Sequence, residues 1–355
     1  MAGAGRQGTR ENRAGGGARG FQALLRAVFA VMPDAQGSGA LHVDQEAGEW
    51  TTITGERRPS GSNAMDKRKD PVRLALRIIL FAVTFLGVFL VSGPWLTWAF
   101  QKLAGSTFAW LFAALSASWL TLRVFEDVPL GAIGLWWNSA SRRNLVLGLA
   151  GGAGVASLAL VLPLATGAAV LVVRGGFEPG SVVFVFFCLA AGALAEEIIF
   201  RGYVLQVLVR GIGPWAAVIP LGVLFGLTHD FNPGANALGL LNTAGFGIAF
   251  GYAYLRSRDL WLPVGLHFAW NLTLVLFGTR LSGNTIFVTG REMTWRAGAL
   301  WSGGEYGPEA SILTSLALIP LFVFLWKAPI RRQYSPLMDP TRENAKCEPS
   351  PLPPS

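Results

Sequence analysis

The chain has few charged residues, which make up 14% of its 355 positions. A soluble domain usually has about a quarter of its residues charged, so the composition excludes an ordinary soluble globular protein. Hydrophobic residues make up 52% of the chain and occur in long blocks, as in proteins that cross a membrane several times. The sequence therefore predicts an all-α fold, a polytopic membrane helix bundle.

Cysteine is scarce as well. Cys188 lies in an apolar block and Cys347 in the polar C-terminal part, so we expect no disulfide framework. The sequence shows no soluble domain, no clear internal repeat and no lipidation box at its end, PLPPS. The net charge of +8 would suggest nucleic acid as a partner of a soluble protein, but the basic residues mostly flank apolar blocks. We therefore expect the lipid bilayer, and no nucleic acid, as a partner.

About eight apolar segments approach the roughly 20 residues needed to span a bilayer. They lie at 74–99, 106–122, 145–173, 181–209, 213–229, 236–255, 261–278 and 310–326. With eight spans, the basic residues before the first span and after the second, fourth, sixth and eighth fall on one side. Positive residues favour the cytoplasmic side, so we expect an integral multi-pass protein of the plasma membrane with both termini cytoplasmic. The loop 279–309 on the other side is mixed in charge, with Arg280, Arg291 and Arg296 against Glu292, Glu305 and Glu309.

The two ends of the chain differ in composition from its centre. Residues 1–64 are rich in Gly, Arg and Ser, and we interpret them as a disordered or non-native extension before a natural start at Met65. Residues 65–332 form the predicted membrane domain. Residues 333–355 are rich in Pro and charge, which predicts a disordered cytoplasmic tail.

One apolar span carries charges, in the stretch LAEEIIFRGY at 194–203. An ionisable residue at mid-membrane costs about 2.5–3.5 kcal/mol on insertion scales and is a functional hypothesis by default. Arg201 lies four residues after Glu197, so the two share a helical face and can pair. Glu196 is left without that partner. A structural alternative, a buried ion-pair cluster that locks helix packing, explains Glu197 better than Glu196.

Two histidines add to this carboxylate. His267 and Asn271 lie four residues apart and can present two hydrogen-bond donors to one point, as in a site that stabilises an oxyanion. Glu196 and His229 are the groups that can activate a water. Together they suggest hydrolysis of an amide. The alternative is zinc bound by Glu196, His229 and His267, although the chain has no H-E-x-x-H motif and these residues come from three predicted helices.

Three motifs in this region resemble those of one family. The segment Glu196–Arg201 resembles the EExxxR motif of the CPBP family of intramembrane proteases, also called the Abi or CAAX-protease family, which includes the Ras-converting enzymes. The segments 225–229 and 267–271 resemble its FxxxH and HxxxN motifs. All three occur in the family's order, without departure from the pattern. The resemblance implies an intramembrane endopeptidase with its core at about 181–278.

The resemblance also implies a role for each residue. Glu196 would be the general base, holding the nucleophilic water together with His229, while His267 and Asn271 would stabilise the oxyanion. No cofactor is implied, and zinc stays the alternative. The supporting residues would be Glu197 and Arg201, which stabilise the site, and Phe225, which shapes it by packing.

The implied partner is a membrane-associated protein or peptide substrate. Eukaryotic relatives cut a tripeptide from prenylated proteins, and other members are linked to bacteriocin immunity or surface-protein processing. A non-enzymatic immunity-type membrane protein is therefore an alternative function. An ion-coupled transporter is a weaker one, because the chain shows no inverted repeat.

One expectation conflicts with the simple topology. His229 falls near the non-cytoplasmic end of its span, and His267 near the cytoplasmic end of another. For both to reach one water, the span before His229 must start later than residue 213, or be short and lie in a water-filled cavity.

Overall fold

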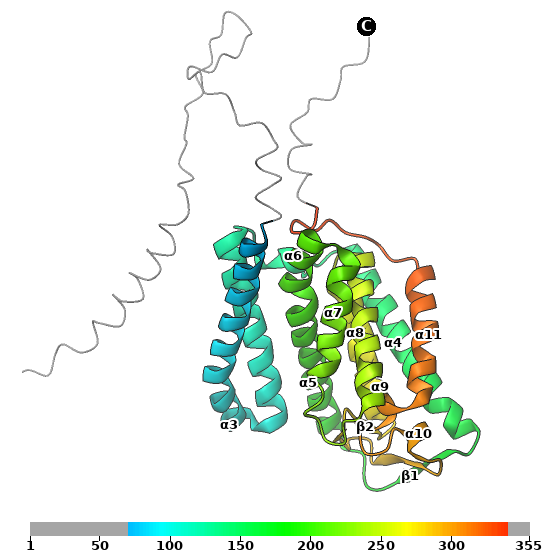
Figure 1. The fold of residues 1–355 in the computed structure, drawn as a ribbon. Coiled ribbons are helices and arrows are strands. Elements are labelled where there is room, and N and C mark those ends of the chain that lie inside the picture. Colours follow the sequence, from blue (N-terminus) through cyan, green and yellow to red (C-terminus); the bar gives the residue numbers. More distant parts are fainter. Residues whose placement is uncertain (1–69, 340–355) are drawn as a thin grey trace, which may run out of the picture. The chain divides into compact units, whose positions relative to one another are not determined.

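The computed structural model describes residues 70–339. The predicted extension at 1–64 and the end of the predicted tail, from residue 340, lie outside the described residues. The described part is a predominantly helical bundle (Figure 1). Four of its helical segments are long and apolar enough to span a membrane: α3 (Pro71–Phe125), α4 (Ser139–Ala165), the continuous segment Pro179–Ile212 and α8 (Ala237–Ser257). Shorter apolar helices are α7 (Pro214–Leu227), α9 (Trp261–Leu276) and α11 (Ile312–Lys327).

Helix α3 is two antiparallel halves joined by a reversal (Figure 1). Gln101 leaves the helical conformation with φ 64° and ψ 171°. The halves approach so closely that a Cβ atom on Gly105 would overlap with the backbone of Leu96. The first half begins at the cap residue Asp70, whose Oδ1 accepts the Val72 N–H at 2.9 Å. The two halves correspond to the first two predicted spans.

The third predicted span, 145–173, is only partly helical. Helix α4 starts with a capping box between Asn138 and Ser141 and ends at Ala165. The chain then turns through Gly167, at φ 74°, into strand β1 (Ala169–Val173), which pairs antiparallel with β4 (Arg291–Trp295). The valine-rich stretch suits a strand. The prediction, which relied on the apolar run alone, therefore made the third span too long. Strands β2 (Arg280–Leu281) and β3 (Asn284–Thr285) form a second small sheet, so the all-α prediction holds for the bundle but not for this loop region.

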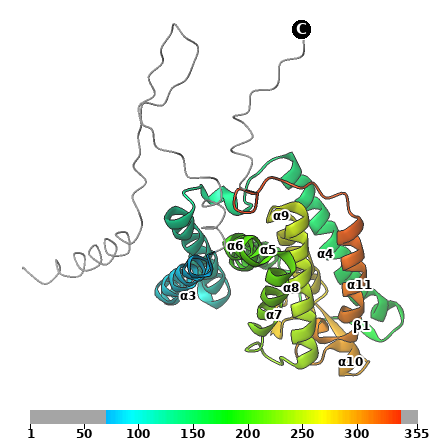
Figure 2. The ribbon, with the colours of Figure 1, turned by 45° about the horizontal axis from the view of Figure 1, so that its top comes forward.

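Helix α9 is held by close backbone packing against α4, and it also packs on α5 (Pro179–Glu197) and α8 (Figure 2). A Cβ atom on Gly152 of α4 would overlap with the carbonyl oxygen of Leu266, and one on Gly148 with that of Leu262. Small residues are the usual means by which membrane helices bring their backbones together. Since Leu266 precedes His267, this contact sets the position of the predicted catalytic histidine.

The segment 278–311 folds over one end of the bundle, where it forms β2, β3, β4, α10 (Ala299–Ser302) and η3 (Pro308–Ala310) (Figure 1). At the opposite end, the chain after α11 is tied back to the helices. The Asp259 carboxylate, in the turn between α8 and α9, accepts hydrogen bonds from Asn144 at 2.7 Å and from Gln333. Burial raises the pKa of Asp259, and these hydrogen bonds oppose the shift.

Candidate active site

The charged cluster lies where one long helix changes its winding. Helix α5 ends at Glu197, continues as the π-helical turn η2 (Ile198–Gly202), and then as α6 (Tyr203–Ile212). Single π-helical turns within α-helices are rare and frequently occur at functional sites. The turn starts directly after Glu196 and Glu197 and contains Arg201.

Glu197 and Arg201 form the ion pair expected from their spacing. Arg201 Nη1 donates to Glu197 Oε1 at 3.1 Å, and both side chains are at most 1% exposed. Arg201 Nη2 also donates to the carbonyl oxygen of Gly247 on α8, at 2.7 Å. The guanidinium carbon lies 4.7 Å from the ring centroid of Phe225, a favourable cation–π arrangement. The pair therefore joins α5 to α7 and α8.

His267 lies between the two glutamates. Its Nδ1 is 2.9 Å from Glu197 Oε1, and its Nε2 is 3.8 Å from Glu196 Oε2. Because a carboxylate only accepts hydrogen bonds, Nδ1 carries the proton that it donates to Glu197, and Nε2 is left facing Glu196. Glu196 Oε2 is buried without a hydrogen bond within residues 70–339. Sequence spacing identified only one partner of Glu197, because the second comes from another helix.

His229 follows the end of α7. Its Nδ1 lies 2.8 Å from the carbonyl oxygen of Phe225, so Nδ1 donates and Nε2 is free to accept. Helix α7 has 14 residues, a length of about 21 Å against a hydrocarbon core of about 30 Å. Of the two options that the sequence left open for this span, a later start or a short helix, the structure has the short helix. The Phe225 ring contacts both imidazoles, with centroids 4.9 Å from His229 and 5.9 Å from His267.

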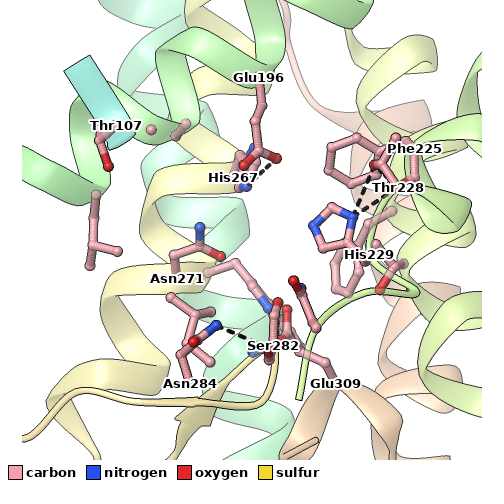
Figure 3. A pocket seen from close by; sticks show the side chains of 18 of the residues that line it. Thr107, Glu196, Phe225, Thr228, His229, His267, Asn271, Ser282, Asn284 and Glu309 are labelled. Atoms are coloured by element: carbon pink, nitrogen blue, oxygen red, sulfur yellow. Dashed lines mark hydrogen bonds and ion pairs between the residues drawn. The ribbon is translucent and has the colours of Figure 1, made fainter. Parts of the chain in front are cut away.

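Four predicted catalytic residues line one cavity of about 320 Å³: Glu196, His229, His267 and Asn271 (Figure 3). Glu196 lies at one end, and Asn271 and His229 face each other further along (Figure 3). No Lys or Arg is among the described residues that line it. A site of this kind offers a carboxylate acceptor, an imidazole acceptor and an amide donor around one volume.

Sequence reasoning missed the other end of this cavity, formed by Ser282, Asn284 and Glu309 (Figure 3). Glu309 is 7% exposed, and its Oε2 accepts both the N–H and the hydroxyl of Ser282. Burial raises the pKa of Glu309, and the Ser282 hydrogen bonds and the nearby His229 oppose this. The sequence placed Glu309 among the charges of a mixed loop, because nothing in its spacing relates it to His229.

The candidate zinc ligands do not form a metal-binding group in this arrangement. Within the described part of the chain, no three His, Cys, Asp or Glu side chains are grouped so that they could hold a metal ion. His267 directs Nδ1 to Glu197 and has Nε2 near Glu196, while His229 directs Nδ1 to the backbone. The test of a metal requirement is therefore biochemical.

Comparison with known proteins matches the central segment of the chain to a protein family. Residues 178–273 match a family model described as type II CAAX prenyl endopeptidase Rce1-like. The resemblance to the CPBP, or CAAX-protease, family is confirmed. No curated protein matches the chain.

The CAAX-protease segment contains the charged cluster, both histidines and Asn271. It begins just before α5 and ends within α9. Helices α3 and α4, the segment 278–311 and α11 lie outside it. The cavity is therefore built from both parts, because Thr107 and Trp110 of α3 line one side of it and Ser282 and Glu309 another.

Proposed function

We propose that the protein is an intramembrane endopeptidase of the CAAX-protease type, which hydrolyses a peptide bond of a membrane-associated substrate. The observation that supports this best is the surroundings of His267, held by Glu197 at 2.9 Å and facing the unpaired Glu196 oxygen inside a cavity. A supporting ion pair needs no unpaired carboxylate beside a cavity, whereas the activation of a water does.

In the proposed mechanism, Glu196 and His229 hold a water by accepting its hydrogen bonds. Glu196 takes a proton as the water oxygen bonds to the carbonyl carbon of the substrate. Asn271 donates a hydrogen bond from its amide to the resulting oxyanion, and His267 donates one from Nε2, which requires its ring to be protonated at both nitrogens because Nδ1 already donates to Glu197. The proton then passes to the amide nitrogen, the C–N bond breaks, and an amine and a carboxylic acid leave. Glu197, Arg201 and Phe225 are the supporting residues: Glu197 and Arg201 fix His267, and Phe225 shapes the space between the imidazoles.

We also propose the finer features of the membrane arrangement. The two halves of α3, the segment 179–212 and helices α4, α7, α8, α9 and α11 would give eight crossings, of which α7, α9 and α11 are shorter than a full span. The basic flanks would then place both termini in the cytoplasm of a cell with this protein in its plasma membrane.

The test is cleavage of a quenched peptide library by purified protein in detergent, with and without a strong chelator. Glu196→Gln is expected to abolish cleavage without changing the melting temperature. The matched control is Glu178→Gln, since Glu178 precedes the same helix, is exposed and makes no capping hydrogen bond. Full activity of Glu196→Gln would contradict the proposal and favour a non-enzymatic, immunity-type function.

The chelator separates the two hydrolytic mechanisms. Cleavage that persists with chelator supports water activated by Glu196. Cleavage that is lost with chelator and restored by zinc would instead assign Glu196, His229 and His267 to a metal site.

A further inference from the structure

The chain after α11 forms a strap that is packed against the bundle. This C-terminal strap, residues 328–339, runs from α11 to α6 (Figure 1 and Figure 2). The Gln333 N–H donates to the carbonyl oxygen of Ser257 on α8 at 2.8 Å. Ser335 is 1% and Leu337 2% exposed, and Leu337 packs in an apolar cluster with residues of α6. The strap is therefore part of the folded bundle.

The strap is bonded to α6 through one buried amide. Ser335 Oγ donates to Gln206 Oε1 at 2.8 Å. Gln206 Nε2 donates to the carbonyl oxygens of Gly202 at 2.7 Å and of Ile133 at 3.0 Å. Gln206 is 0% exposed. Because its oxygen and its nitrogen are both bonded to protein groups, this amide is held in a single orientation.

Gly202 is the residue at which the π-helical turn ends. Its ψ of −111° lies outside the helical range, so the regular backbone is interrupted between η2 and α6. A π-helical turn closes hydrogen bonds between residues i and i+5, one residue more than an α-helical turn. The direction of the side chains on either side therefore depends on where this turn ends. The Gln206 amide binds the carbonyl oxygen at that point.

A second contact holds the same part of α6. The Tyr203 hydroxyl donates to Glu126 Oε1 at 3.3 Å, and Arg77 Nη2 lies 2.6 Å from the same oxygen. Arg77 lies near the start of α3, and Glu126 directly follows its end. Arg77, Glu126 and Ser335 all lie outside the matched segment 178–273. Parts of the chain outside the CAAX-protease segment therefore hold the end of the π-helical turn inside it.

The π-helical turn is connected to the proposed catalytic groups by a short series of contacts. Glu196 and Glu197 directly precede the turn, and Arg201 within it donates to Glu197 at 3.1 Å. Glu197 in turn accepts a hydrogen bond from His267. A change in where the turn ends would move Arg201 and both glutamates relative to His267. A displacement of reacting groups by about 1 Å can lower the rate roughly a hundredfold.

We propose, on the basis of the proposed peptidase function, that Gln206 and Ser335 are positioning residues for this site. Ser335 orients the Gln206 amide on the Gly202 carbonyl, and this contact keeps the π-helical turn in the register that directs Glu196 into the cavity. The C-terminal strap is then a required part of the catalytic assembly, although none of its residues lines the cavity.

The first measurement does not depend on catalysis. Backbone amide exchange of the full chain in detergent is followed by mass spectrometry. Ser335→Ala is expected to accelerate exchange at residues 198–206 at least about threefold, because a local opening loses one hydrogen bond. The amides of β4, at the other end of the bundle, should exchange as in the wild type. Unchanged exchange at 198–206 would overturn the proposal.

The matched control is Ser118→Ala. Ser118 is another serine that is 0% exposed, and its hydroxyl has no hydrogen bond within residues 70–339. Its replacement removes a buried hydroxyl without breaking a contact to α6, so exchange at residues 198–206 should stay as in the wild type. Equal acceleration in Ser118→Ala and Ser335→Ala would overturn the proposal, because the effect would then not come from the strap.

The second measurement asks whether the contact positions the catalytic groups. On a quenched peptide that the wild type cleaves, well below the melting temperature, Ser335→Ala is expected to lower kcat about threefold to tenfold with KM unchanged. Gln206→Met keeps the length of the side chain but removes the donor, and it should lower kcat further. Because Ser335 acts through Gln206, adding Ser335→Ala to Gln206→Met should not lower kcat again.

The outcomes separate this proposal from the proposed function. Independent effects of the two substitutions, or a wild-type kcat in Ser335→Ala, would overturn the positioning role. If Gln206→Met does not fold, Ser335→Ala decides the proposal together with its Ser118→Ala control. A wild-type protein that cleaves no peptide would contradict the proposed function instead, and the exchange measurement would still show whether the strap holds the turn.

Discussion

Replacing Arg201 with Met tests how much the buried ion pair stabilises the site. The substitution keeps an unbranched side chain but leaves the Glu197 carboxylate, 0% exposed, without its cation. Removal of one partner from a buried pair typically costs about 3–5 kcal/mol. His267 still donates to Glu197 at 2.9 Å, so we expect the lower end, about 3 kcal/mol. At about 2 °C per kcal/mol, the melting temperature should fall by roughly 6 °C.

The assay is thermal unfolding of purified protein in detergent, followed by tryptophan fluorescence. Arg123→Met is the matched control, because Arg123 and Asp127 form an ion pair with the same spacing on the surface, with side chains 61% and 88% exposed. Exposed pairs contribute little, so this variant should melt like the wild type. Adding Glu197→Gln to Arg201→Met should recover part of the loss, since no buried charge is then unpaired. An unchanged melting temperature for Arg201→Met would refute this account of the pair.

Two further predictions concern packing and pH. Gly152→Ala should lower both the melting temperature and the peptidase activity, at a cost of about 1–3 kcal/mol, because its Cβ would overlap with Leu266 and displace α9. Gly154→Ala on the same helix, with open space around it, should change neither. Equal effects of the two variants would contradict the view that the Gly152 contact positions α9. For Asp259, burial raises the pKa in the folded chain, so its contribution to stability is lost as pH rises through that value. The melting temperature of the wild type relative to Asp259→Asn should therefore rise as the pH is lowered from neutral towards the ordinary pKa of an aspartic acid, about 4. A fall over this range in the same unfolding assay would contradict a raised pKa of Asp259.

Helical periodicity explains why part of the site could be predicted from the sequence. Contacts between residues four apart, such as Glu197 with Arg201, follow from the geometry of a single helix. The apolar segments likewise located the helices of the described region, because burial in lipid requires long runs of apolar residues. The predicted end of the third span, residue 173, was wrong because an apolar strand and the end of an apolar helix have the same composition.

Contacts between elements could not be predicted in the same way. The bond from His267 to Glu197 joins residues 70 positions apart, and Glu309 reaches the cavity only because Ser282 and Asn242 hold its segment across the end of the bundle. The short α7 was one of two options for bringing His229 to its place, and only the structure selects it. The catalytic roles of these residues stay predictions until the variants are measured.

The glycine contact between α4 and α9 has a consequence for protein engineering. The CAAX-protease segment contains the predicted catalytic residues, but α9 packs closely against α4, a helix outside that segment. A chimera that received residues 178–273 alone would place His267 and Asn271 against a foreign helix surface and shift them relative to Glu196. A transplant that keeps the position of α9 therefore needs α4, and one that also keeps the cavity wall formed by Thr107 and Trp110 needs α3 as well.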